Sequence, residues 1–122
     1  MAIKVAIVED DSAISQMYRI KFEAEGYDVE TAENGLLGLK LCEEMKPDIV
    51  LLDLMMPEMR GDQMLVKLRK TSWGKNTKVV ILTNMGEQEI PSSIKDLGVS
   101  AVILKADMTP RQVAELIKKQ LA

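Results

Sequence analysis

The feature that most constrains this chain is an alternation, repeated five times, of a short apolar run and a segment with helical spacing. Most of the runs are rich in Val, Ile and Leu, which is typical of strands buried on both faces of a parallel sheet. Because each run is followed by a helical segment, the pattern predicts one parallel sheet with helices on both faces. The expected strands are residues 3–8, 28–32, 49–52, 78–82 and 101–104.

The helix boundaries are marked by residues that stop or cap helices. Gly26 and Gly98 follow two helical segments, Pro47 follows a third, and the last begins with the capping sequence Thr109-Pro110-Arg111-Gln112. The expected helices are residues 12–25, 34–46, 60–70, 89–97 and a last helix from residue 109. Their predicted inward positions are Ile14, Met17, Tyr18, Phe22, Leu37, Leu41, Met45, Met64, Leu65, Leu68, Val113, Ile117 and Leu121.

The second expected strand is more polar than the others, so we place it at an edge of the sheet. With five β–α units, this position favours a flavodoxin-like α/β fold, a doubly wound parallel sheet in the order 2-1-3-4-5. In that order the first strand lies beside the third. The length suits a single domain, residues 1–122.

Polar side chains follow four of the five expected strands, each directly after the apolar run. They are the acidic cluster Glu9-Asp10-Asp11, and then Asp53, Thr83 and Lys105. The carboxyl ends of parallel strands meet at one edge of a sheet, where α/β folds bind ligands. We therefore expect these side chains to share one pocket, apart from Asp11, which we assign to capping the first helix.

The residue types at this edge suit metal-assisted phosphoryl transfer. Carboxylates packed together repel one another unless a cation lies among them, and a chain without histidine favours a hard, oxygen-bound ion such as Mg²⁺. Asp53 is then the nucleophile that forms an acyl phosphate. Lys105 would pair with this carboxylate and then with a phosphoryl oxygen, and Thr83 would hydrogen-bond another oxygen.

The composition argues against several other classes of function. A net charge of −3 gives no reason to expect direct binding to nucleic acid or to an anionic membrane. The apolar stretches are too short to span a bilayer and no signal peptide is recognisable, so we expect a cytoplasmic protein. The single cysteine, Cys42, is expected to pack as a small apolar residue rather than to act in redox chemistry.

One family pattern contains these residues in this order. It consists of Glu9-Asp10-Asp11, the segment from Asp48 to Pro57, Gly61 at the turn before the third helix, Thr83, Gly98 and Lys105. Through these residues, nearly the whole chain resembles the receiver domain of bacterial two-component response regulators. The resemblance implies that Asp53 is the phosphoacceptor, that Asp10 binds Mg²⁺ directly and Glu9 mostly through water, and that the Met55 carbonyl completes the protein ligands.

The resemblance also implies partners in a phosphorelay. A sensor histidine kinase or a phosphotransfer protein would donate the phosphoryl group to Asp53. Phosphorylation would switch the face formed by the fourth helix, fifth strand and fifth helix, and a downstream protein or output domain would bind there. Such a domain gains and loses a phosphoryl group and is not a turnover enzyme. We favour a free-standing receiver over a piece of a longer regulator.

Several positions depart from the family pattern. Ala106 stands where receivers usually have a cis proline, and a cis bond at a non-proline residue costs about 3 kcal/mol, so we expect a trans bond after Lys105. Val102 replaces an aromatic residue that swings inward on activation. Met55 and Met85 flank the path of the attacking water and cannot orient it by a strong hydrogen bond, which predicts slow self-dephosphorylation.

Three other functions compete with this interpretation. A flavodoxin-like electron carrier needs a phosphate-binding loop after the first strand, where the acidic cluster would repel a phosphate. An aspartyl-phosphate phosphatase generally needs a second acid two residues after the nucleophile, where this chain has Met55. The third is a degenerate receiver that binds partners without phosphorylation, an alternative that Ala106 and Val102 leave open.

Overall fold

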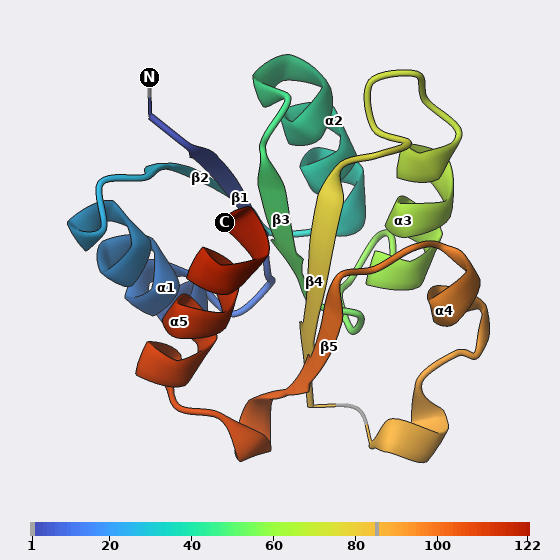
Figure 1. The fold of residues 1–122 in the computed structure, drawn as a ribbon. Coiled ribbons are helices and arrows are strands. Elements are labelled where there is room, and N and C mark those ends of the chain that lie inside the picture. Colours follow the sequence, from blue (N-terminus) through green and yellow to red (C-terminus); the bar gives the residue numbers. More distant parts are fainter. Residues whose placement is uncertain (1, 85) are drawn as a thin grey trace.

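The computed structural model describes residues 2–84 and 86–122, and its core is a parallel sheet of five strands in the order β2-β1-β3-β4-β5 (Figure 1). This is the predicted flavodoxin-like order, with β2 at one edge. Three strands have the predicted bounds, whereas β1 begins one residue later and β4 includes Thr83. The strands are β1 (Lys4–Val8), β2 (Asp28–Ala32), β3 (Ile49–Leu52), β4 (Lys78–Thr83) and β5 (Ala101–Leu104).

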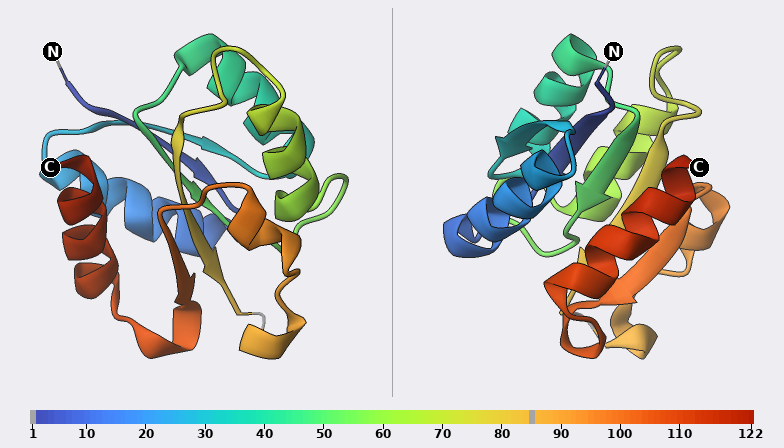
Figure 2. Two further views of the ribbon diagram at one scale, coloured as in Figure 1. Left: turned by 45° about the vertical axis from the view of Figure 1, so that its right-hand side comes forward. Right: turned by 60° about the vertical axis from the view of Figure 1, so that its left-hand side comes forward.

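Helices cover both faces of the sheet. Helices α1 and α5 lie side by side on one face, and α2, α3 and α4 cover the other (Figure 2). The helices are α1 (Ser12–Ala24), α2 (Gly35–Met45), α3 (Gly61–Arg69), α4 (Ser93–Asp96) and α5 (Pro110–Leu121), with the 3₁₀ turns η1 (Glu87–Glu89) and η2 (Lys105–Asp107). Among residues 2–84 and 86–122, no helix is long and apolar enough to cross a membrane.

Two hydrophobic cores lie on opposite sides of the sheet, because successive side chains of a strand point to opposite faces. In β1, Ala6 and Val8 join the core under α2 and α3, whereas Val5 and Ile7 join the core under α1 and α5. A strand buried on both faces has no room for polar side chains, which explains the uninterrupted apolar runs. Strand β2 fully buries only Val29, as expected for an edge strand.

The segment predicted as the fourth helix, residues 89–97, is mostly not helical. Ile90 has extended backbone (φ −69°, ψ 126°), and the helix is limited to Ser93–Asp96. Pro91 accounts for the difference, because proline lacks the N–H needed inside a helix and holds the preceding residue in extended backbone. The prediction of one continuous helix was therefore wrong.

Two of the predicted inward side chains are exposed, namely Met17 and Leu37. On α2 the fully buried positions are instead Gly35, Gly38 and Cys42. This helix approaches the sheet through its small residues, so its largest apolar side chains do not mark its inner face. Helical spacing of large residues alone was a misleading guide on these two helices.

The caps predicted for two helices are present. Asp11 Oδ1 accepts hydrogen bonds from the N–H groups of Ala13 and Ile14 at 3.0 and 3.1 Å. At the start of α5, Gln112 N–H donates to Thr109 Oγ1 at 3.2 Å and Thr109 N–H donates to Gln112 Oε1 at 2.9 Å. Asp11 is thus used by the backbone of α1, which separates it from its two acidic neighbours.

Candidate functional site

The carboxyl edge of the sheet, where all five strands end, brings together the acidic residues predicted to meet there (lower side of Figure 1). Val8 is aligned with Leu52 and its carbonyl accepts the Asp53 N–H at 3.0 Å, so Glu9 and Asp53 follow neighbouring strands. Carboxylate oxygens of Glu9, Asp10 and Asp53 lie within 4.8 Å of one another. Glu9 and Asp53 are only 5% and 6% exposed, whereas Asp10 faces solvent.

Lys105 joins two of these carboxylates. Its Nζ donates to Glu9 Oε1 at 2.6 Å and to Asp53 Oδ2 at 3.2 Å. Burial alone would lower the pKa of Lys105, but the hydrogen bond to Glu9 and the charges of both carboxylates outweigh burial and raise the pKa. The other Asp53 oxygen, Oδ1, accepts the Met55 N–H at 3.2 Å. Asp53 is therefore held from both sides, with a cation fixed beside one oxygen.

Glu9 carries most of the electrostatic strain of the site. Burial, followed by the nearby Asp53 carboxylate, raises the pKa of Glu9 to about 8 despite the nearby Lys105. Its Oε2 atom is buried and has no hydrogen-bond partner among the described residues. Buried carboxylate oxygens normally have a partner, so this atom beside two further carboxylates fits a site for a hard divalent cation. Glu9, Asp10 and Asp53 could together hold such an ion.

Thr83 and Lys105 reach the same edge from the last two strands. Thr83 is the last residue of β4, is fully buried and is aligned with Leu104. Lys105 begins the turn η2, and its peptide bond to Ala106 is trans, which confirms the prediction. Met85, predicted to flank the pocket, lies outside the described residues.

Gly61 packs directly against the backbone of Asp53. A Cβ at Gly61 would collide with the Asp53 carbonyl oxygen, and the Gly61 N–H donates to the Leu54 carbonyl at 3.0 Å. The backbone of Gly61 is not in the left-handed region. Glycine is required here by the close approach of two chain segments rather than by the special turn that the sequence suggested.

Sequence reasoning missed Arg60 at the rim of this site. With Asp10, Met55 and Met56, Arg60 lines a hollow of about 450 Å³ beside the carboxylates. A signal was available, because Arg60 precedes α3 at the position where Ser, Thr, Asp or Asn usually caps a helix. Only the fold shows that this side chain borders the same hollow as Asp10.

Several proteins with sequences similar to this chain are response regulators. The family profile described as "Response regulator receiver domain" matches residues 5–118. The transcriptional regulatory protein CpxR homolog of Haemophilus influenzae is 45% identical over 85 residues, which are 69% of this chain and 35% of that protein. The transcriptional regulatory protein SrrA of Staphylococcus aureus is 32% identical over 121 residues, which are 99% of this chain and 48% of that protein. The chain therefore spans about half or less of the length of these relatives.

Solved structures give the same assignment. A response regulator receiver domain protein from Methanospirillum hungatei JF-1 has a TM-score of 0.90 and 30% identity, covering 99% of this chain and 94% of that one. The chemotaxis protein CheY4 of Vibrio cholerae has a TM-score of 0.88 and 27% identity, covering 98% of both chains. The profile, the relatives and the strand order agree, and the chain therefore belongs to the response regulator receiver domains, the phosphorylation-accepting modules of two-component signalling.

Proposed function

We propose that Asp53 is the residue that accepts the phosphoryl group. The observation that carries this proposal is the position of the Lys105 ammonium, which contacts both Glu9 and Asp53 and so fixes an Asp53 oxygen. A carboxylate oxygen held beside a cation is a suitable nucleophile for phosphorus. Attack by this oxygen forms the acyl phosphate, and the donor departs with the electron pair of the bond that breaks.

Glu9, Asp10 and Asp53 would hold a Mg²⁺ ion, with the Met55 carbonyl oxygen as a further protein ligand. When bound, Mg²⁺ offsets the repulsion among the carboxylates and the charge that develops on the phosphoryl oxygens. The buried Glu9 Oε2, which lacks a partner among the described residues, supports its part in this set. Asp10 is exposed at the mouth of the pocket, which suits a residue that meets an ion arriving from solvent.

Thr83 and Lys105 would bind the transferred group. The Lys105 ammonium has three N–H donors, of which Glu9 and Asp53 use two; the third has no partner among the described residues and could bind a phosphoryl oxygen. The Thr83 hydroxyl lies at the same edge of the sheet and would gain a charge-assisted hydrogen bond to another oxygen. These two residues bind the product of the transfer, and neither needs to change its protonation state.

We propose a sensor histidine kinase or a phosphotransfer protein as the donor, and a downstream protein or an output domain as the partner that responds. The described chain contains no histidine, so a phosphohistidine must come from a partner. The relatives above are transcriptional regulators, yet this unit has a net charge of −3, and we assign it no direct contact with nucleic acid. Its own chemistry is limited to gain and loss of the phosphoryl group at Asp53.

Intact-mass analysis tests the proposal. After incubation with acetyl phosphate and Mg²⁺, the protein should gain one phosphoryl group, and chelation of Mg²⁺ should prevent the gain. The variant Asp53→Ala should remain unmodified under the same conditions. An adduct that persists in this variant would refute the assignment of Asp53, and the absence of any adduct on the unsubstituted protein would refute phosphoryl acceptance itself.

We further propose that phosphorylation moves mainly the loop after Thr83 and helix α4. A Thr83 drawn toward a phosphoryl oxygen displaces the segment that follows it. Helix α4 has only four residues, so few backbone hydrogen bonds resist its movement. On β5, Val102 is 42% exposed and is too small to swing inward as an aromatic side chain would. A hollow of about 490 Å³ between α4, β5 and α5 marks the face that we assign to the downstream partner.

Amide hydrogen exchange with and without beryllofluoride, a phosphoryl mimic, tests this switch. The change in protection should be concentrated in residues 84–97, with less at Ala101–Leu104. Asp53→Ala, which removes the attachment site of the mimic, is the control. An equal or larger change at Ala101–Leu104 would contradict the proposed path.

A further inference from the structure

The hollow beside Asp53 has a combination of charge and apolar surface that suits a small anionic phosphodonor. We propose that the hollow lined by Asp10, Met55, Met56 and Arg60 receives the leaving group of a small acyl phosphate, and that Arg60 selects such dianionic donors. The inference rests on the proposed role of Asp53 as acceptor. It adds the residue that recognises the donor and its leaving group.

The hollow adjoins the carboxylate cluster that contains the acceptor. It shares Asp10 with this cluster, and carboxylate oxygens of Asp10 and Asp53 lie within 4.8 Å of each other. Asp53 is buried, whereas Asp10, Met55 and Arg60 are exposed, which puts the hollow on the solvent side of the attacking oxygen. In phosphoryl transfer the leaving group departs on the side of phosphorus opposite to the nucleophile. A volume of about 450 Å³ is ample for a short acyl group.

Arg60 is held in place and keeps donors available. Its backbone N–H donates to Gln63 Oε1 at 3.1 Å, and its Nε donates to Asp62 Oδ1 at 3.1 Å. Its two terminal nitrogens have no hydrogen-bond or ion-pair partner among the described residues. A guanidinium fork with free N–H groups binds carboxylate and phosphate oxygens in a bidentate manner. An exposed pair such as Arg60–Asp62 adds little to stability, so its effect is to aim the guanidinium.

The two methionines supply the remainder of the recognition. Met56 is almost fully buried and Met55 is 58% exposed, so together they form an apolar floor that is open to the solvent side. Methionine is flexible and polarisable, and it adapts to apolar groups of different size. The floor therefore accepts the carbon chain of an acyl group while Arg60 contacts its oxygens.

Electrostatics explain why a small donor needs Arg60. With Mg²⁺ bound, the ion and the Lys105 ammonium only balance the charges of Glu9, Asp10 and Asp53, so the pocket has no net positive charge to attract a dianion. Among the residues that line the hollow, Arg60 is the cation. In the transfer, an Asp53 oxygen bonds to phosphorus, the bond from phosphorus to the acyl oxygen breaks, and the carboxylate leaves with the electron pair. No proton is required, so Arg60 acts by binding the donor and its leaving carboxylate.

The test compares Arg60→Gln, Arg60→Lys and a control, Arg111→Gln. Arg111 lies on α5, on the face of the sheet opposite α3, and does not line the hollow, so its substitution removes the same charge at another place. Rates of adduct formation are measured by intact mass against the concentration of acetyl phosphate and of phosphoramidate, which carries one negative charge fewer at neutral pH. Arg60→Gln should raise the half-saturating concentration of acetyl phosphate about fivefold, as expected for loss of one exposed charge-assisted contact. The plateau rate should change less than twofold.

Three further results are expected. Phosphoramidate should be affected less than twofold, Arg60→Lys should recover part of the loss, and the difference from the unsubstituted protein should shrink in high salt. Mg²⁺ affinity measured by calorimetric titration should not fall in Arg60→Gln. A fall that matches the loss in rate would move the effect to the metal site and overturn the proposal.

Equal behaviour of Arg60→Gln and Arg111→Gln, or an equal loss with both donors, would also overturn the subsite while leaving Asp53 as acceptor. The absence of any adduct on the unsubstituted protein is a different failure, since it would remove the acceptor role and the subsite with it.

Discussion

The carboxyl edge of the sheet, where the strands end, and the amino edge, where they begin, differ in how completely their charged groups are paired. At the carboxyl edge, three carboxylates lie together and two of them share one lysine. Within residues 2–84 and 86–122, the buried Glu9 Oε2 has no hydrogen-bond partner, and burial and Asp53 raise the pKa of Glu9 to about 8. At the amino edge, where the strands begin, Lys4, Asp48 and Arg69 each have hydrogen-bond partners. Arg69 donates to the carbonyl oxygens of Leu97, Gly74, Thr77 and Gly98 at 2.7 to 3.2 Å.

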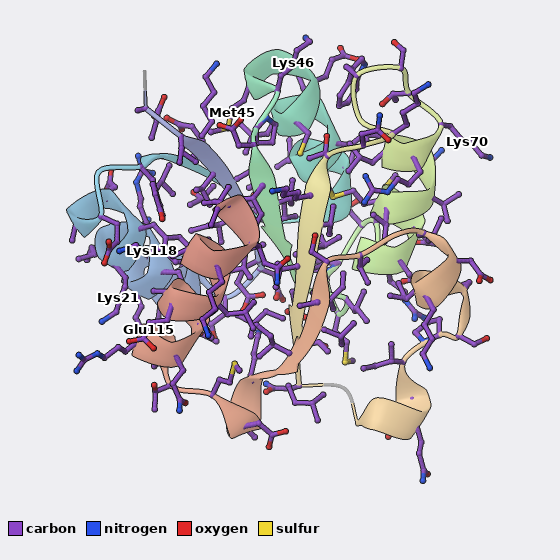
Figure 3. All side chains as sticks on the ribbon, in the orientation of Figure 1. Lys21, Met45, Lys46, Lys70, Glu115 and Lys118 are labelled. Atoms are coloured by element: carbon purple, nitrogen blue, oxygen red, sulfur yellow. The ribbon has the colours of Figure 1, made fainter. Side chains whose placement is uncertain are left out.

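Other contacts at the amino edge follow the same rule. Asp48 Oδ2 accepts the Lys4 N–H at 2.8 Å, and Lys4 Nζ donates to the Met45 carbonyl at 3.3 Å. Figure 3 shows Met45 and Lys46 at the end of α2, and Lys70 at the end of α3, on this upper side of the molecule. The helix ends and the strand starts are thereby joined by direct hydrogen bonds.

The amino edge therefore contributes stability, and the carboxyl edge carries the chemistry. Arg69 joins the loop between α3 and β4 to the loop between α4 and β5, so the start of β4 and β5 is fixed independently of the acidic site. The fold can then tolerate a carboxyl edge that is destabilised by repulsion until a cation or a phosphoryl group relieves it.

Removing the Arg69 side chain from the amino edge should have the largest effect on the free energy of unfolding. Arg69→Met leaves four carbonyl oxygens without their donor, and we expect a loss of about 3 kcal/mol in the free energy of unfolding. Urea denaturation monitored by circular dichroism measures it. Lys70→Met, at the exposed end of the same helix (Figure 3), is the control and should change stability by less than about 0.5 kcal/mol. Similar losses in the two variants would show that Arg69 does not join the loops energetically.

One substitution made at both edges should change stability in opposite directions. Asp53→Asn removes a repelling charge beside Glu9 and should stabilise the protein by about 1 kcal/mol while abolishing phosphoryl acceptance. Asp48→Asn weakens a charge-assisted hydrogen bond to Lys4 and should destabilise by about 0.5 kcal/mol. The midpoints of urea denaturation without Mg²⁺ measure both. A destabilised Asp53→Asn would end the claim that the carboxyl edge is strained.

The pH dependence of the free energy of unfolding should reflect the protonation of Glu9. The pKa of Glu9 is about 8 in the folded protein, and in the unfolded chain it takes the ordinary value of 4.5. Between these two pH values the folded protein therefore binds more protons than the unfolded one. Stability without Mg²⁺ should therefore fall as pH rises from about 5 to 8. Denaturation at several pH values measures the slope, and Glu9→Gln should flatten it. A slope unaltered in that variant would assign the dependence to other groups.

The smallest effect concerns the lifetime of the phosphorylated state. Met55 is exposed beside the pocket and cannot orient a water molecule by a strong hydrogen bond. Met55→Asn should speed release of phosphate by about threefold, since an amide can position the attacking water. A phosphate-release assay after removal of the donor measures the rate, with Met17→Asn, an exposed methionine on α1, as the control. Equal rates in both variants would contradict this role for Met55.

Much of the architecture could be predicted because burial on both faces leaves a clear mark on a sequence. The five apolar runs gave the strands, and the residues directly after them gave the acidic cluster, Asp53, Thr83 and Lys105. Two predictions failed for different reasons. Pro91 divides the predicted fourth helix by a local effect on the backbone. On α2, packing against the sheet selects the small residues rather than Leu37.

Arg69 and Arg60 could not have been placed from the sequence. Arg69 is one of several cations near the end of α3, and its partners lie up to 29 residues away. Arg60 matters because its loop returns to the side of Asp10, which no local pattern indicates. Pairing between distant segments depends on the packed geometry, whereas the strands depend mainly on their own residues.

The burial of Cys42 has a practical consequence. This thiol is fully buried on α2 and its pKa is raised to about 12, so on the order of one molecule in ten thousand or fewer carries the reactive thiolate at neutral pH. Because it is the only cysteine in the chain, an alkylating reagent should leave the native protein unmodified and react only with molecules that have opened. The rate at which Cys42 is alkylated therefore reports how often the fold opens. A second cysteine introduced on the surface could carry a fluorescent label, because Cys42 would not react in the native protein.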